Sequence, residues 1–499
     1  MGHATVRFDP DDRVGAINPR LYGNFVEHLG RCVYTGIYEP GHPSADEDGL
    51  RQDVIDLVKE LGITIVRYPG GNFVSGFRWE DSVGPQDQRP TRLDLAWHSL
   101  ETNQFGLDEF MTWCRKTGVE PMMAVNLGSR GPLDAVDLLD YCNGVAPTTL
   151  ANQRRANGHD EPYGVRMWCL GNEMDGPWQF GHKTPQEYAR IAAETGRVMK
   201  QFDPDLELVA AGSSSPLMET FGEWERTVLE EAWDQVSHVS LHRYYEPIDG
   251  DMQSFLASAD DLDAFIRGIV ATADAVAARK HSDKRIQISV DEWNVWYSKR
   301  AESIVPSGDD WPVAPPLLED KYCAADAVVV GDLMITLLAN ADRVTAACMA
   351  QLVNVIGPIM TEKGGRAWRQ TIFHPFAITA REGRGDTVRS RITSPRVATA
   401  QHGEVDAIRT VVTRRDDDSL AIFATNRDLA SEHTLFIDAR DCDGREVKSA
   451  QIIHHDDLEA TNTADHPDTV VPVDVEVRFV DGGVEIDLPA VSWAVITLA

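Results

Sequence analysis

Short apolar runs alternate with amphipathic stretches eight times between residues 20 and 353. The apolar runs cover residues 21–27, 63–69, 121–128, 165–173, 206–212, 238–244, 285–293 and 344–353. Near-continuous apolar runs of this length are typical of parallel strands that are buried on both faces. The stretches between them have helical spacing, as in residues 50–61, where we expect a helix that ends at Gly62.

Eight strand and helix units in this order predict an α/β protein with a (β/α)8 barrel, or TIM barrel, over residues 18–374. A doubly wound open sheet has the same local pattern and is the alternative fold. Such sheets usually contain fewer strands, so the barrel is the leading prediction.

The pattern changes to all-β after about residue 375. Segments rich in β-forming residues lie at 407–413, 419–425, 433–439, 475–480 and 484–498, with turn sequences at 414–419 and 481–483. This spacing leaves no room for crossover helices. We therefore predict a C-terminal, jelly-roll-like β-sandwich over residues 375–499. The strand-like segment 4–8, within residues 1–17, is expected to join this sandwich.

The charge balance limits the class of partner. The 499 residues include 47 Lys and Arg against 79 Asp and Glu, which gives a formal charge of −32. Such a field repels phosphate backbones and anionic membranes, so we expect neither nucleic acid nor membrane as a partner. A neutral or cationic small molecule is the favoured substrate.

Residues 1–10 lack the apolar stretch of a secretory signal, and the apolar segment 328–341 is too short to span a bilayer. The seven cysteines are dispersed and have no CxxC spacing, which argues against a disulfide framework and a zinc site. We therefore expect a cytoplasmic protein with buried, reduced thiols.

Polar residues interrupt the apolar runs at their last positions. Because the active site of a barrel lies at the carboxyl ends of its strands, these residues are the candidates for chemistry. They are Glu27 and His28, Arg67, Asn172 and Glu173, His242 and Tyr244, Glu292, and Gln351. The spacing of His242 and Tyr244 places both on one face of their strand.

Glu173 and Glu292 are the most informative pair. In an eight-stranded barrel of roughly 15 Å diameter, strands 4 and 7 face each other across about 14 Å. Two inward Glu side chains then leave about 5 Å between their carboxyl groups, the separation of a retaining glycosidase. Aromatic residues flank both and suit the apolar face of a sugar. Either Glu alone could form a structural salt bridge, and strand alternation predicts that Asp291 points out of the barrel.

Several long motifs closely resemble glycoside hydrolase family 51, the intracellular α-L-arabinofuranosidases. They are GNFVEHLG (23–30), VRYPGGNFVSGFRWEDSVGP (66–85), LAWHSLETNQFG (95–106), WCLGNEMDGPWQFGHKT (168–184), HRYYEP (242–247) and VDEWNVWY (290–297). The family combines a catalytic (β/α)8 barrel with a C-terminal β-sandwich. The resemblance therefore implies the fold that the apolar pattern predicts.

The resemblance also implies residue roles. Glu173, in the GNE motif, corresponds to the general acid/base and Glu292, in the DEW motif, to the nucleophile. Asn172 matches the residue that holds the sugar 2-hydroxyl. The remaining matches are Glu27, Arg67, Asn72, Tyr244 and Gln351, which bind the furanose or orient the nucleophile, His242 near the catalytic pair, and Trp97 and Trp296 in the subsites. No metal or organic cofactor is implied, and relatives commonly form homo-oligomers such as hexamers.

We therefore expect a retaining α-L-arabinofuranosidase that releases terminal arabinofuranosyl units from arabino- and arabinoxylo-oligosaccharides by double displacement. Other barrel glycosidases, such as β-xylosidases and endoglucanases, place the same carboxylate pair on strands 4 and 7. A metal-dependent sugar isomerase could use Glu27, His28, His242 and Glu292 as ligands. A non-catalytic carbohydrate-binding protein is the third alternative. The preferred linkage, 1,2, 1,3 or 1,5, stays open.

Overall fold

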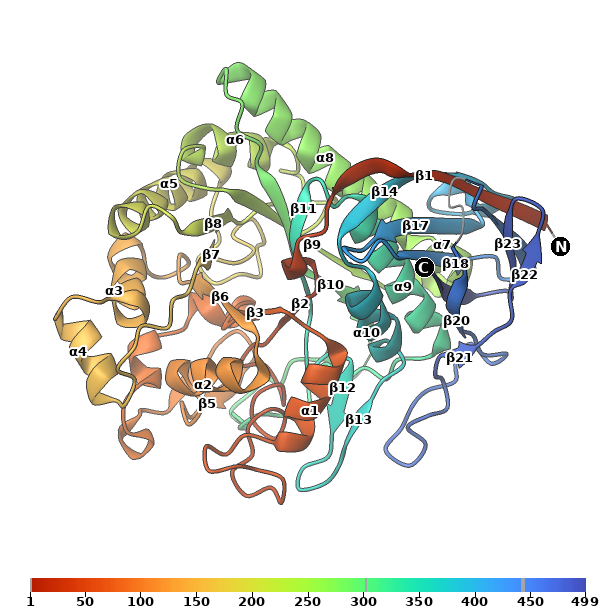
Figure 1. Ribbon diagram of the computed structural model, residues 1–499. Helices are drawn as coiled ribbons and strands as arrows, with labels where there is room; N and C mark the ends of the chain where they lie inside the picture. The colour runs from red at the N-terminus through yellow and green to blue at the C-terminus, as the bar shows by residue number, and fades with distance from the viewer. Residues whose placement is uncertain (1, 301–302, 441–444) are drawn as a thin grey trace.

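The computed structural model describes residues 2–300, 303–440 and 445–499. Eight parallel strands close into a barrel in the order β10-β11-β2-β3-β6-β7-β8-β9 (Figure 1). Their bounds are β2 Gly23–Phe25, β3 Ile65–Tyr68, β6 Glu120–Val125, β7 Met167–Leu170, β8 Glu207–Ala210, β9 His238–Tyr245, β10 Gln287–Val295 and β11 Val344–Met349. Each predicted run contains or overlaps one barrel strand. The barrel is confirmed, and the open-sheet alternative is wrong.

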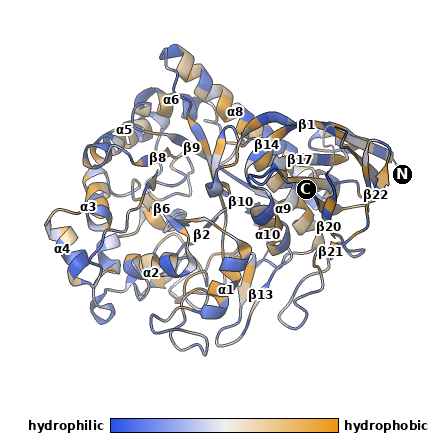
Figure 2. Cartoon of the chain, in the orientation of Figure 1, coloured by the Kyte–Doolittle hydropathy of each residue, from blue (hydrophilic) through white to orange (hydrophobic). Residues whose placement is uncertain are grey.

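Helices cover the outside of the barrel (Figure 1). They are α1 Gln52–Leu61, α2 Leu107–Thr117, α3 Pro132–Asn143, α4 Thr149–Ala156, α5 Pro185–Phe202, α6 Glu223–Ala232, α7 Met252–Leu256, α8 Ser258–Arg279, α9 Ala324–Ala339 and α10 Phe373–Glu382. The predicted end of α1 is found at Gly62, which has φ +77° and donates its N–H to the carbonyl of Val58. The outer helices carry both hydrophilic and hydrophobic residues, as amphipathic helices do (Figure 2).

α9 differs from the other helices because it is apolar around most of its circumference. It lies between the barrel and the C-terminal sheet and contacts β11 on one side and β17, β18 and β24 on the other. A helix buried on all sides has no polar face to keep in water, which accounts for its composition.

The C-terminal β-rich domain is one ten-stranded sheet with the order β21-β20-β24-β18-β17-β14-β1-β19-β23-β22. Its strands are β1 Gly2–Ala16, β14 Asp386–Thr393, β17 Ile408–Arg414, β18 Leu420–Asn426, β19 His433–Asp438, β20 Val447–Ile453, β21 Val473–Asp474, β22 Arg478–Val480, β23 Gly483–Leu488 and β24 Ser492–Leu498. β1 pairs antiparallel with β14, which lies beside it in Figure 1, and parallel with β19. The predicted combination of a barrel with a C-terminal β-domain is confirmed.

Side chains alternate between two cores along this sheet. On β18, Leu420, Ile422 and Ala424 enter a core made only by the sheet, whereas Ala421 and Phe423 join the core shared with the barrel. The boundary expected at residues 374/375 falls inside α10, which packs on α1 and α9. The domain limits stay a prediction.

Three short hairpins complete the described fold: β4 Arg92–Asp94 with β5 Ser99–Glu101, β12 Ile359–Thr361 with β13 Ala367–Arg369, and β15 Arg396–Thr399 with β16 Gly403–Asp406. Among the described residues, no helix is both long and apolar enough to cross a membrane. Six cysteines are free and buried, and Cys442 lies outside the described residues.

Candidate active site

A cavity of about 580 Å³ opens at the carboxyl ends of the barrel strands. Eight of the eleven sequence-predicted site residues line it: Glu27, Asn72, Trp97, Glu173, Tyr244, Glu292, Trp296 and Gln351. The other three are buried beneath its surface: Arg67 and His242 contact lining residues, and Asn172 contacts Arg67. The structure therefore brings all eleven together in one site.

Glu292 lies on β10 at the base of the cavity, and three donors surround its carboxylate. Arg67 on β3 donates to Oε1 at 2.7 Å and the hydroxyl of Tyr244 on β9 donates to Oε2 at 2.8 Å. His242 Nδ1 is 3.6 Å from Oε2. Burial by itself would raise the pKa of Glu292, but the charges of His242 and Arg67 and the donated hydrogen bonds bring it below its ordinary value. The group is held as a carboxylate.

Glu173 follows β7 in a tight turn. Its φ of +42° is unusual for a residue with a side chain and costs of order 1 kcal/mol or more. Oε1 receives a contact of 2.9 Å from His242 Nδ1, and the indole N–H of Trp178 donates to Oε2 at 2.5 Å. Trp178 is half exposed, so Glu173 lies nearer the solvent than Glu292 does.

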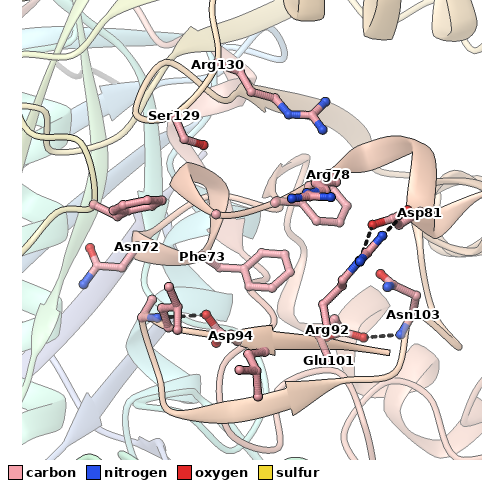
Figure 3. Close-up of a pocket in the computed structure, with 16 residues that line it drawn as sticks. Asn72, Phe73, Arg78, Asp81, Arg92, Asp94, Glu101, Asn103, Ser129 and Arg130 are labelled. Atoms are coloured by element: carbon pink, nitrogen blue, oxygen red, sulfur yellow. Dashed lines mark hydrogen bonds and ion pairs between the residues drawn. The ribbon is translucent and has the colours of Figure 1, made fainter. Parts of the chain in front are cut away.

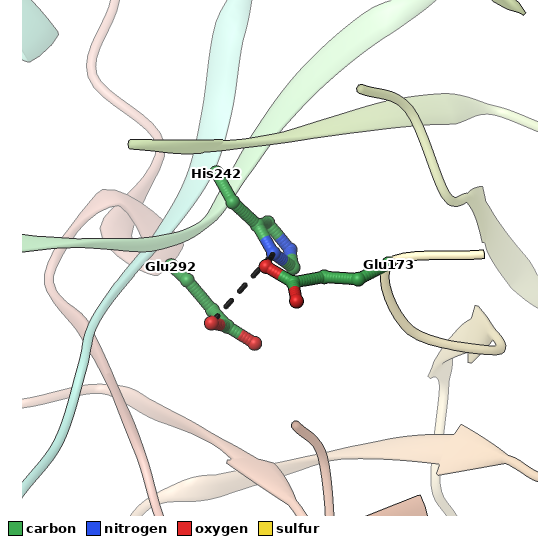
Figure 4. Close-up of side chains that lie close together, drawn as sticks. All are labelled: Glu173, His242 and Glu292. Carbon is green, nitrogen blue, oxygen red and sulfur yellow. Dashed lines mark hydrogen bonds and ion pairs between the residues drawn. The ribbon is translucent and has the colours of Figure 1, made fainter. Parts of the chain in front are cut away.

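The imidazole of His242 links the two carboxylates (Figure 4). One oxygen from each and Nδ1 of His242 all lie within 4.8 Å of one another. The carboxyl separation of about 5 Å expected from barrel geometry is of this size. Burial lowers the pKa of His242, but the charges of Glu292 and Glu173 outweigh it and raise that pKa. Two carboxylates and an imidazole at this spacing could also hold a metal ion.

Glu27, just after β2, lines the cavity and holds the neighbouring side chains of its wall in place. It accepts hydrogen bonds from the indole of Trp97, the backbone N–H of Phe73 and the amide of Gln351, each at 2.9 Å. Burial raises the pKa of Glu27 well above its ordinary value, against the bonds from Phe73 and Trp97 and with a contribution from Glu292. Glu27 thereby fixes an aromatic ring and an amide at the edge of the cavity.

Arg67 connects Glu292 to the GNE motif. Besides Glu292 it donates to Oδ1 of Asn172 at 2.5 Å, and the Asn172 amide then points to Gln179 at 3.3 Å. A single fully buried guanidinium therefore orients Glu292 and Asn172 together. This arrangement leaves little freedom for either side chain.

The expectation that Asp291 points out of the barrel is wrong. Asp291 Oδ2 lies 3.8 Å from Nε of Arg67 and accepts from the Cys169 thiol at 3.6 Å, so it is inside with residues of β3 and β7. The reason is a β-bulge: Ser289 and Glu292 pair with Ser240 and His242, so β10 carries one extra residue. The bulge breaks the alternation of side chains and turns both acids inward.

Two aromatic residues shape the mouth of the cavity next to Glu292. The rings of Tyr244 and Trp296 meet edge to face, with centroids 5.3 Å apart. The indole of Trp296 donates to the hydroxyl of Ser303 at 3.1 Å, which holds the ring against the following loop. Flat apolar surfaces of this kind suit the face of a sugar ring.

A second cavity, of about 480 Å³, adjoins the first at Asn72 and Ala96 (Figure 3). Its wall includes the β4–β5 hairpin, where Arg92 pairs with Asp81 at 2.8 Å. Burial raises the pKa of Asp94 in this hairpin to about 7. Of the eleven sequence-predicted site residues, Asn72 lines both cavities.

Sequence reasoning missed Ser214 and Ser215, which also line the active-site cavity. They follow β8 directly, so the strand-end rule could have found them. Serine is common in loops, which weakens that signal. Asp175 and Gln179 were missed as well, because they act through contacts between loops that no local pattern reveals.

Two carboxylates held across the mouth of a (β/α)8 barrel, among aromatic rings, define the protein as a glycoside hydrolase in class. Family models agree: residues 57–265 match the α-L-arabinofuranosidase 1 domain and residues 291–492 the α-L-arabinofuranosidase C-terminal domain. The chain belongs to the α-L-arabinofuranosidases of glycoside hydrolase family 51, enzymes of EC 3.2.1.55.

Individual relatives support this over the full length. The chain is 55% identical over 500 residues to an intracellular exo-α-(1→5)-L-arabinofuranosidase of Streptomyces lividans, covering 99% of this chain and 75% of the relative. It is 54% identical to an exo-α-(1→6)-L-arabinofuranosidase of Bifidobacterium longum, covering 98% and 96%. A solved family 51 enzyme of Bifidobacterium longum superimposes with a TM-score of 0.95 at 48% identity, covering 99% of both chains.

Family membership sets aside the other classes considered from the sequence. The isomerase alternative included His28 among its possible ligands. Both ring nitrogens of His28 are engaged instead, with Glu101 and with the hydroxyl of Tyr68, each at 2.7 Å. His28 therefore does not join the group formed by Glu173, His242 and Glu292.

Proposed function

We propose that the enzyme cleaves terminal α-L-arabinofuranosyl units by double displacement with retention of configuration. The observation that carries the proposal is the close approach of Glu173 and Glu292, whose nearest oxygens lie within 4.8 Å with His242 between them. Carboxyl groups about 5 Å apart leave no room for a water between the second carboxylate and the anomeric carbon, so this carboxylate attacks the sugar itself.

In the first step, Glu292 attacks the anomeric carbon while Glu173 gives a proton to the departing glycosidic oxygen. The depressed pKa of Glu292 supports this assignment, because a nucleophile must be ionised. Arg67 and Tyr244 each donate a hydrogen bond to one of its two oxygens, which fixes the orientation of the carboxylate. The product is an arabinosyl ester of Glu292.

In the second step, Glu173 takes a proton from a water molecule, which attacks the same carbon and breaks the ester. Its place in the turn after β7, open toward the cavity, gives water access to this carboxylate. We assign to Asn172, whose side chain Arg67 fixes, the contact with the 2-hydroxyl, which strengthens in the transition state.

For the substrate, we propose terminal non-reducing units of arabino- and arabinoxylo-oligosaccharides. Two of the most similar relatives are named as exo-enzymes, one for α-(1→5) and one for α-(1→6) linkages. Several are also named intracellular, which supports action on short oligosaccharides in the cytoplasm. A panel of linked arabinobioses compared by kcat/KM identifies the preferred linkage.

The stereochemical course tests the proposal. With an aryl α-L-arabinofuranoside as substrate, we expect the NMR spectrum of the first product to show the α-anomer of arabinose before mutarotation. First appearance of the β-anomer, with the α-anomer only later, would mean that water displaces the aglycone directly. That result would remove Glu292 from the role of nucleophile.

A further inference from the structure

We propose that Asp175 is a positioning residue that anchors the turn carrying Glu173, through Ser214, so that the acid reaches the glycosidic oxygen. The inference deepens the proposed function and rests on the acid/base role of Glu173. It concerns a contact between two loops that is separate from the residues holding the sugar or the nucleophile.

The turn itself offers Glu173 little support. Glu173 has φ +42°, and the turn it starts is closed by one backbone bond, from the N–H of Gly176 to the Glu173 carbonyl at 2.9 Å. Its side chain meets only His242 and the half-exposed Trp178 among the contacts given above. An unfavourable backbone conformation persists only where surrounding contacts hold it.

Asp175, two residues further on, supplies such a contact. Its Oδ2 accepts two hydrogen bonds from Ser214, from the backbone N–H at 3.0 Å and from the hydroxyl at 3.2 Å. Asp175 and Ser214 are both about nine-tenths buried. Two bonds to one carboxylate oxygen fix the position of that side chain relative to the loop after β8.

The loop after β8 is in turn tied to the rest of the site. The N–H of Ser213 donates to Glu225 of α6 at 2.8 Å, and the Ser213 carbonyl accepts the N–H of His242 at 3.4 Å. Since the His242 ring contacts Glu173, the contacts form a closed ring through Glu173, Asp175, the two serines and His242. Asp175 belongs to the same turn as Glu173, with Met174 between them, so its bonds to Ser214 fix the turn on which Glu173 stands.

The electrostatics agree with a buried, partly compensated acid. Burial raises the pKa of Asp175 to about 6, the bonds from Ser214 lower it, and the nearby Glu173 raises it. The Oδ2 atom of Asp175 is occupied by Ser214. Its orientation toward Ser214 indicates a structural support for the acid.

The test compares two substrates with Asp175→Ala, Asp175→Asn and Ser214→Ala. A 2,4-dinitrophenyl arabinofuranoside has a leaving group that needs no proton, whereas an arabinobiose needs Glu173 as acid. For Asp175→Ala we expect kcat/KM to fall roughly 10- to 100-fold on arabinobiose and less than about 3-fold on the dinitrophenyl substrate. For Asp175→Asn, whose amide oxygen accepts the same two bonds, we expect both values within about 5-fold of wild type.

Ser214→Ala removes one of the two donors to Asp175. Its loss of kcat/KM on arabinobiose is expected to lie between the losses of Asp175→Asn and Asp175→Ala. Asp108 supplies the matched control: it is buried, accepts bonds from Tyr141 and Tyr163, and lies outside the active-site cavity. Asp108→Ala should lower the stability of the fold but change kcat/KM by the same factor on both substrates. Should Asp175→Ala fail to fold, Asp175→Asn and Ser214→Ala carry the comparison.

Equal losses on both substrates, or an Asp175→Asn variant as impaired as Asp175→Ala, would overturn the positioning role. Glu173→Ala measured in parallel separates this failure from that of the proposed function. If Glu173→Ala shows the substrate difference and Asp175→Ala does not, only the present inference fails. If Glu173→Ala also shows none, the assigned acid is wrong.

Discussion

The two catalytic carboxylates occupy contrasting surroundings. Glu292 belongs to a buried strand and is enclosed by donors from β3 and β9. Glu173 lies beyond the end of its strand, in a strained turn, next to an exposed indole. In the proposed mechanism these surroundings suit two tasks: Glu292 is stabilised as an anion within a strand, and Glu173 stands in a loop that is open to the leaving group and to water.

The largest loss of activity is expected on substitution of Glu292. Glu292→Ala should reduce kcat/KM by about 10⁴-fold or more on dinitrophenyl and oligosaccharide substrates alike, because no covalent step is possible without the nucleophile. Steady-state kinetics on both substrates measure this. Residual activity within about 100-fold of wild type on either substrate would contradict the role of Glu292 as the nucleophile.

The second effect separates the acid from the nucleophile. Glu173→Ala should lose about 10²- to 10⁴-fold in kcat/KM on arabinobiose but less than about 10-fold on the dinitrophenyl arabinofuranoside. Azide, which needs no general base, should replace water in this variant and give an arabinosyl azide with retained configuration. An azide product of inverted configuration would contradict the assignment.

A smaller effect is expected when one donor to the nucleophile is removed. Tyr244→Phe deletes a hydrogen bond to a charged group, worth about 1.5 to 3 kcal/mol, or roughly a 10- to 100-fold loss in kcat/KM on both substrates. Because this bond lowers the pKa of Glu292, its loss should raise that pKa.

The acidic limb of the kcat/KM profile of Tyr244→Phe should therefore move to higher pH, and the loss should be greater at acid pH than near neutrality. A pH profile of the wild type and the variant decides this. An unmoved limb would mean that Tyr244 acts on the sugar and not on Glu292.

The smallest effect is expected at the cavity mouth. Ser303→Ala removes the hydrogen bond that holds Trp296, a neutral bond worth about 0.5 to 1.5 kcal/mol. We expect KM to rise up to about tenfold with little change in kcat, equally on both substrates. A loss confined to kcat would place Trp296 in the chemistry instead.

Much of the fold could be predicted because buried parallel strands are apolar throughout. The residues in the carboxyl-terminal part of such strands, or just after them, gather at one rim by topology alone, which is why Glu27, Arg67 and Glu292 could be identified. The β-strands of the C-terminal domain were harder: β14 and β20 mix exposed and buried positions, so their apolar signal is weak. α10, which spans the predicted boundary at 374/375, is held by tertiary packing on α9, and the local sequence pattern carries no information about such packing.

The parts of the site that escaped prediction depend on three-dimensional contacts. Asp291 was misplaced because alternation holds only for a regular strand, and the bulge in β10 has no sequence signature of its own. The bond between Asp175 and Ser214 joins residues 39 positions apart on two loops. Local spacing carries no information about such a pair.

Mass spectrometry after covalent trapping tests the central claim most directly. A mechanism-based arabinofuranosyl reagent that forms a slowly hydrolysed ester should label one peptide, the one containing Glu292, with a stoichiometry of one per chain. Protection by arabinose should prevent the label. A label on Glu173 or Glu27, or no ester at all during turnover, would contradict the division of labour between the two carboxylates.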